Sequence, residues 1–139
     1  MGGYGAFKLA LGCPGQYAAA ASLSGALDLA CHIHDEWDEC RQRTFNAVFG
    51  DMESIPGSGN DLIARVKALE SVPDTEFYVA CGTEDFLYPD AVHFRQAAAE
   101  KGLRLTYEES GGDHTWSFWD TYIQRVLEWL PVEKLEMPE

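Results

Sequence analysis

An acidic residue and a histidine follow two successive apolar segments of this 139-residue sequence. Asp85 comes after the continuous apolar run 77–81, and His114 comes after the alternating segment 103–107. A carboxylate that orients an imidazole is the supporting pair of a nucleophilic triad, in which the imidazole takes the proton of the nucleophile. Glu84 and Asp90 are competing carboxylates for this role, because they flank Asp85 in the sequence.

A nucleophile for this pair is expected earlier in the chain, in a Gly-x-Ser-x-Gly turn between a strand and a helix. The sequence contains no complete Gly-x-Ser-x-Gly. It opens instead with Met1, Gly2 and Gly3, followed by a short apolar segment that favours a helix. This is the pattern expected just after the serine of such a turn, so we expect the serine to precede Met1, with Gly2 as the last glycine of the motif.

The elements that would position these residues alternate between helix and strand. Apolar spacing and Gly and Pro breakers predict helices over 4–11, 61–72, 89–101 and 117–130, and strands over 18–25, 77–81 and 103–107. Ser58 with Asp61, and Ser117 with Asp120, fit capping boxes that open two of the helices. Such alternation is typical of a parallel α/β sheet. We expect a partial domain over 1–131, with a helical excursion over 26–73 near the site, and a polar tail over 132–139.

Composition excludes several classes of function. The formal net charge of −13 disfavours binding to nucleic acids and to anionic membrane surfaces. No apolar run approaches the ~20 residues of a membrane-spanning helix. Four cysteines without a Cys-x-x-Cys pair indicate reduced thiols, so we expect a cytoplasmic protein.

Five segments carry a specific resemblance to a known family. They are MGGYGAFKLAL, ASLSGALD, NAVFGDMESIPGSGNDL, CGTEDFLY and GGDHTWSFWDTYI, in this order. Together they resemble the C-terminal half of the esterase D family, and within it the tributyrin-esterase-like α/β-hydrolases. The resemblance implies half of an α/β-hydrolase fold, with three parallel strands and flanking helices, and serine-dependent hydrolysis of short-chain carboxylic esters without a cofactor. It assigns Asp85 as the triad acid, His114 as the triad base and the backbone N–H of Met1 as an oxyanion-hole donor.

Other polar and aromatic residues leave alternatives open. Cys31, His32, His34, Asp35 and Cys40 include zinc-ligand types, but their spacing lacks the short repeated pairs of a structural zinc site, so we expect no metal there. The charged excursion that holds them brings Trp37 toward the substrate pocket. Trp116, two residues after His114, belongs either to the core or to the substrate cleft. His93 lies inside a predicted amphipathic helix, and we expect it to be an ordinary surface histidine.

Three expectations about function follow. The parent enzyme acts on a small-molecule ester, and these 139 residues alone are inactive because the nucleophile is missing. Within the same chemistry, hydrolysis of the thioester S-formylglutathione is the alternative. Outside it, the alternative is a non-catalytic fragment or binding module, whose open sheet edge would also favour self-association.

Overall fold

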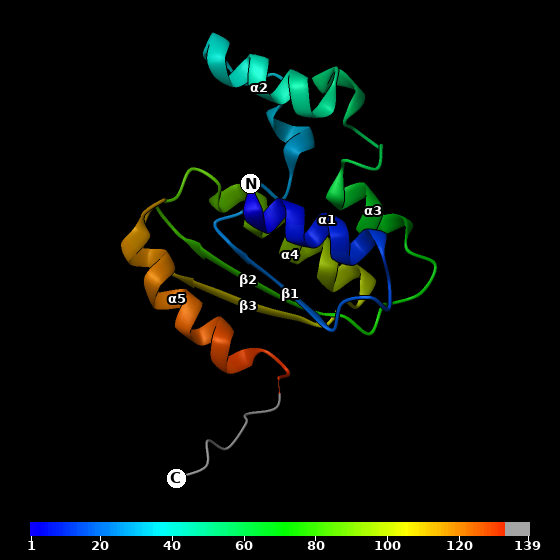
Figure 1. Cartoon of the computed structure of the whole chain (residues 1–139), viewed down its shortest axis with the longest axis vertical. Helices are drawn as coiled ribbons and strands as arrows, with labels where there is room; N and C mark the ends of the chain where they lie inside the picture. Colours follow the sequence, from blue (N-terminus) through cyan, green and yellow to red (C-terminus); the bar gives the residue numbers. More distant parts are fainter. Residues whose placement is uncertain (133–139) are drawn as a thin grey trace.

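Three parallel strands form the centre of the structure, a computed structural model that describes residues 1–132 (Figure 1). They are β1 (Ala19–Leu23), β2 (Glu76–Gly82) and β3 (Leu105–Ser110), and their order in the sheet is β1-β2-β3. The expected three-stranded parallel sheet is therefore confirmed. The predicted tail over 132–139 lies, apart from its first residue, outside the described residues.

Helices cover both faces of the sheet. On one face lie α1 (Gly2–Gly12), α3 (Leu62–Ala68) and α4 (Tyr88–Lys101), and on the other lies α5 (Trp116–Trp129) (Figure 1). Strand β2 divides its side chains between them: Phe77 and Val79 pack in the first core, and Tyr78 and Ala80 in the second. Burial on both faces explains why this strand reads as a continuous apolar run. None of the helices within residues 1–132 is both long and apolar enough to cross a membrane.

The amino end of α1 packs closely against β1. A Cβ atom built on Gly3 would lie 2.2 Å from Oγ of Ser22, which is fully buried near the carboxyl end of β1. Any larger residue at position 3 would push the helix away from the strand. This close approach brings Met1, the N-cap residue of α1, to the edge of the sheet where the strands end.

The excursion expected over 26–73 is helical. It contains two 3₁₀ turns, η1 (Leu29–His32) and η2 (Met52–Ser54), and the helices α2 (Glu39–Phe49) and α3. Figure 1 shows α2 standing off the sheet, beyond α1. It has no buried residue, and Phe49 joins it to Tyr4 of α1 through an edge-on aromatic contact with a centroid distance of 5.8 Å.

Two predicted capping boxes are wrong. The N-cap of α3 is Asp61, whose carboxylate accepts the N–H of Ala64 at 2.9 Å, while the hydroxyl of Ser58 donates to the carbonyl of Ile55. The N-cap of α5 is Thr115, and Ser117 already lies inside the helix. A capping residue must adopt an extended backbone, and a motif of residue types does not show which of two polar residues does so.

The third strand begins later than predicted. Leu103 was expected inside it, but its N–H donates to the carbonyl of Ala98 and so closes the end of α4. Gly102 makes this possible with a left-handed backbone, φ 78°. The strand therefore starts at Leu105 and runs to Ser110, which carries it closer to His114 than expected.

Candidate active site

The loops after β2 and β3 are joined by hydrogen bonds. The N–H of Thr83 donates to the carbonyl of Ser110 at 2.9 Å, and the N–H of Glu84 donates to that of Gly112 at 3.0 Å. The Glu84 carboxylate accepts the N–H of Gly112 in return, which lowers the pKa of Glu84. Glu84, one of the competing carboxylates, therefore holds the loop of His114 rather than its imidazole.

Gly82 allows the two loops to meet. A Cβ atom at this position would lie 2.0 Å from the carbonyl oxygen of Gly112, a backbone atom that cannot move aside cheaply. The last residue of β2 must therefore be glycine for the two loops to approach this closely. Their approach brings together Asp85 and His114, which are 29 residues apart.

Asp85 and His114 form a hydrogen-bonded pair. Nδ1 of His114 lies 3.0 Å from Oδ2 and 3.2 Å from Oδ1 of Asp85. The Asp85 side chain is fully buried, and its Oδ1 also accepts the N–H of Leu87 at 2.9 Å. The carboxylate is thus held from two sides, and it fixes the imidazole through Nδ1.

The other ring nitrogen of His114 is free to act. Among the described residues, Nε2 of His114 has no hydrogen-bond partner, and the side chain is 35% exposed. The ring stands between Phe86 and Trp119, each at a centroid distance of 4.8 Å. A fixed imidazole with one carboxylate-bound nitrogen and one open nitrogen is the arrangement of a general base.

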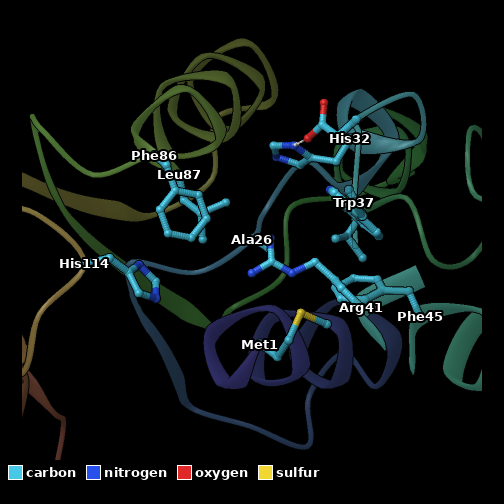
Figure 2. A pocket seen from close by; sticks show the side chains of 11 residues that line it. Met1, Ala26, His32, Trp37, Arg41, Phe45, Phe86, Leu87 and His114 are labelled. Carbon is cyan, nitrogen blue, oxygen red and sulfur yellow. Dashed lines mark hydrogen bonds and ion pairs between the residues drawn. The ribbon is translucent and has the colours of Figure 1, made fainter. Parts of the chain in front are cut away.

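His114 faces a cavity of about 400 Å³, shown in Figure 2. Met1, at the start of α1, lines the same cavity. Trp37 forms part of the opposite wall and packs against Phe45 of α2 with a centroid distance of 4.4 Å. The structure therefore places Met1, Trp37 and His114 around one space, and the binding of substrate there stays a prediction.

Trp116 lies outside this cavity. Its side chain is 83% exposed and contacts Trp119 edge-on, so it takes no part in the core. It lines a second, more open hollow of about 580 Å³ along the β1 edge, which Met1 and His114 also line. The core alternative for Trp116 is therefore wrong, and its role in a substrate cleft stays a prediction.

A second acid–histidine cluster lies beside the cavity, and the sequence analysis missed it. Nε2 of His32 lies 2.7 Å from Oδ1 of Asp90, and Nδ1 lies 2.6 Å from Oδ2 of Asp35. Asp90 is fully buried, and its Oδ2 accepts the N–H of Asp28 at 3.0 Å. Hydrogen bonding to Asp90, and then to Asp35, raises the pKa of His32 to about 9. Asp90, the other competing carboxylate, thus pairs with His32 and not with His114.

The side chains around Cys31 that could bind a metal ion are not the set considered from the sequence. Two groups of described residues bring ligand atoms within 4.8 Å of one another: Asp28, Cys31 and His93, and Cys31, His32 and Asp90. His93 was expected to be a plain surface histidine, but its Nδ1 pairs with Oδ2 of Asp28 at 2.7 Å. Partial desolvation of the Cys31 thiol, which lies at the surface, and the nearby carboxylates raise its pKa to about 12. Each of these side chains also takes part in an internal hydrogen bond or ion pair.

A match over nearly the whole chain identifies the protein family. The family described as "Putative esterase" matches residues 1–130. The chain belongs to this esterase family. An acetyl esterase of Caldicellulosiruptor saccharolyticus is 33% identical over 138 residues, which cover 94% of this chain and 51% of that protein.

Solved structures of serine hydrolases share the fold of this esterase chain. The S-formylglutathione hydrolase FrmB of Staphylococcus aureus superposes with a TM-score of 0.76 at 27% identity, covering 91% of this chain and 50% of that one. FphF, a fluorophosphonate-binding serine hydrolase of the same organism, gives 0.77 at 27% identity, covering 91% and 49%. The expected α/β-hydrolase fold is confirmed, and the chain spans about half the length of these relatives.

Proposed function

We propose that this chain carries the acid and the base of a serine esterase. The observation that supports this most directly is the buried carboxylate of Asp85 on Nδ1 of His114, with Nε2 of the same ring open to the cavity. The esterase family and the serine hydrolases of similar fold agree with this chemistry. The nucleophile in this proposal is a serine immediately before Met1.

The proposed reaction follows from the positions of these groups. The serine Oγ attacks the ester carbonyl carbon while Nε2 of His114 takes its proton, and Asp85 stabilises the imidazolium. The backbone N–H of Met1 donates to the oxyanion of the tetrahedral intermediate. His114 then returns the proton to the leaving alcohol, an acyl-serine remains, and water activated by His114 releases the carboxylic acid. No step needs a cofactor.

Short-chain carboxylic esters are the proposed substrates. One relative, 33% identical, is an acetyl esterase, and a cavity of about 400 Å³ suits a small ester. A second candidate is the hydrolysis of S-formylglutathione, which the similarity to FrmB favours. Both reactions use the same triad and differ only in the leaving group.

The test uses the protein extended upstream of Met1 through the proposed serine and the strands before it, called here the extended protein. We expect it to hydrolyse nitrophenyl acetate and to lose this activity when that serine is replaced by alanine. Comparing kcat/KM for S-formylglutathione with that for short acyl esters separates the two candidates. An extended protein that folds, contains Gly-x-Ser at this place and turns over neither ester nor thioester contradicts the proposal.

The free side of β1 is proposed to make the 139-residue chain self-associate. In the described sheet β1 pairs only with β2, and the apolar side chains of Ile123 and Leu127 are exposed on α5, which packs beneath the same edge. An unpaired strand edge beside exposed apolar surface promotes association. Size-exclusion chromatography at rising concentration should show dimers or larger species. A sharp monomer peak at high concentration contradicts this.

A cytoplasmic location is also proposed. All four cysteines are free thiols, and Cys13, Cys31 and Cys40 are exposed. Exposed free thiols suit a reducing compartment. Fractionation of cells that express the extended protein tests this, and recovery with the secreted or envelope fraction contradicts it.

A further inference from the structure

One cationic side chain points into the cavity that holds His114. Arg41 lies in the first turn of α2, where its backbone N–H donates to the carboxylate of the N-cap residue Asp38 at 2.8 Å. From there its side chain extends into the cavity, toward Ala26 and between the walls that carry His114 and His32 (Figure 2). The guanidinium is therefore presented to whatever occupies the space in front of His114.

Arg41 has no carboxylate partner within the described part of the chain. Of the six arginines, Arg95 pairs with Glu109, Arg104 with Asp74 and Arg125 with Glu108, whereas Arg43 and Arg65, like Arg41, have no carboxylate partner among the described residues. In a chain with 23 acidic residues and a net charge of −13, a counter-ion for an arginine is easy to supply. Of the three arginines without such a partner, Arg41 is the one that lines the cavity in front of His114, so its guanidinium is available to a ligand there.

The acidic side chain on the same cavity wall is already engaged. Oδ2 of Asp35 lies 2.6 Å from Nδ1 of His32 and forms no ion pair with Arg41. Protonated His32, whose pKa is raised to about 9, lies between Asp35 and Asp90, so its single positive charge is shared by two carboxylates. Among the described residues, Arg41 thus remains a cation of this wall that has no carboxylate within ion-pair distance.

The rest of the lining makes this charge more effective. Leu29, Phe45, Phe86 and Leu87 surround the cavity with apolar surface. Electrostatic attraction is stronger beside such surface than in bulk water, because the local dielectric constant is lower. A guanidinium also offers a planar pair of N–H donors that matches the two oxygens of a carboxylate.

We propose that Arg41 binds a carboxylate group of the substrate, so that the substrate class is esters that carry an anionic group in addition to the bond that is cleaved. This inference rests on the proposed function, since it concerns the same cavity. The carboxylate can belong to the acyl part or to the alcohol part of the ester. In either case the Arg41 guanidinium orients the ester, while His114 acts as the base at the ester bond that is cleaved.

The experiment compares matched esters with the extended protein. For the acyl part, the mono-nitrophenyl ester of glutaric acid is compared with nitrophenyl pentanoate, which lacks the carboxylate. For the alcohol part, acetoxybenzoate is compared with its methyl ester. We expect kcat/KM to favour the anionic member of one pair, and Arg41→Gln to reduce that preference about tenfold. Arg41→Lys should retain part of it, because lysine keeps the charge but loses the paired donors.

Arg43 supplies the matched control. It lies on the same helix and is exposed, but it does not line the cavity. Arg43→Gln removes the same charge and should leave both preferences unchanged. The proposal is overturned if neither anionic ester is preferred, or if Arg43→Gln lowers the preference as much as Arg41→Gln.

Failure of this inference is distinguishable from failure of the proposed function. If the neutral esters are hydrolysed but Arg41→Gln changes no preference, only the inference fails. If no ester is hydrolysed, the proposed function fails, and binding of glutarate then tests Arg41 alone. An NMR shift of the Arg41 guanidinium on titration with glutarate supports the anion site, and the lack of any shift overturns it.

Discussion

Two acid–histidine clusters border the same cavity, and they differ in what they leave free. Among residues 1–132, His114 is bound through Nδ1 alone, so Nε2 remains open toward the cavity. His32 is bound through both ring nitrogens, by Asp35 and Asp90. An imidazole between two carboxylates holds its proton and has no open nitrogen with which to accept another. The same residue types therefore give a candidate base in one place and a structural ion cluster in the other.

The largest effect expected from this comparison is on turnover. In the extended protein, Asp85→Asn or His114→Ala should lower kcat by about 10³- to 10⁴-fold, because the imidazole loses its orientation or is removed. His32→Gln should lower it less than tenfold, because His32 takes no proton from substrate. The measurement is the hydrolysis rate of nitrophenyl acetate by each folded variant. A loss with His32→Gln as large as that with His114→Ala would show that the two clusters do not divide their roles in this way.

A smaller effect is expected on stability, through the pKa of His32. This pKa is about 9 in the folded protein, against an ordinary value of 6.5. Because the folded state raises the pKa, the stabilisation is complete below about pH 6.5 and is lost as the pH rises through about 9. The difference corresponds to roughly 3 kcal/mol of unfolding free energy at its maximum.

Urea unfolding of the wild type and of His32→Gln between pH 6 and pH 10 measures this contribution. We expect the gap in unfolding free energy between the two proteins to narrow as the pH rises through 9. His34→Gln is the matched control, because His34 is an exposed histidine two residues away. A gap that stays constant over this range, or a His32 imidazole that titrates near 6.5 by NMR, contradicts the assignment.

The smallest effect is expected at the aromatic walls. Trp37 packs on Phe45 and forms part of the cavity wall opposite His114, whereas Trp116 is 83% exposed in the open hollow. Trp37→Ala should raise KM for a short ester about fivefold with little change in kcat, through lost apolar contact with substrate. Trp116→Ala should raise KM less. Steady-state kinetics of both variants, with Trp37→Phe as the conservative control, measure this, and a larger effect at Trp116 reverses the assignment of the pocket wall.

The sequence was sufficient to pair Asp85 with His114 and insufficient to pair His32 with Asp90. The first pair follows two neighbouring parallel strands, whose carboxyl ends must lie side by side. The second joins a short 3₁₀ turn to the first turn of α4, across 58 residues. The stretch around His32 has no clear hydrophobic period, so its path over the sheet depends on tertiary packing. The direction of the Arg41 side chain depends on the same packing and could not be predicted from the sequence either.

The local ends of elements were also only partly predictable. The three strands and the covering helices follow from apolar runs and from Gly and Pro breakers. The cap residues Asp61 and Thr115 do not, because the choice among nearby polar residues is made by backbone conformation. The role of Gly82 was hidden as well. A side chain at position 82 would collide with Gly112 of another loop. This constraint becomes visible only when the two loops are placed together in the fold.

The most direct test of the central claim is covalent labelling with a fluorophosphonate, read by intact mass and peptide mapping. The account predicts one adduct on the extended protein, at the serine immediately before Met1. That adduct should be abolished by His114→Ala and retained in His32→Gln, and the 139-residue chain alone should remain unlabelled. An adduct on a serine within residues 1–139, or labelling that does not depend on His114, would contradict the claim that this chain supplies the acid and the base but not the nucleophile.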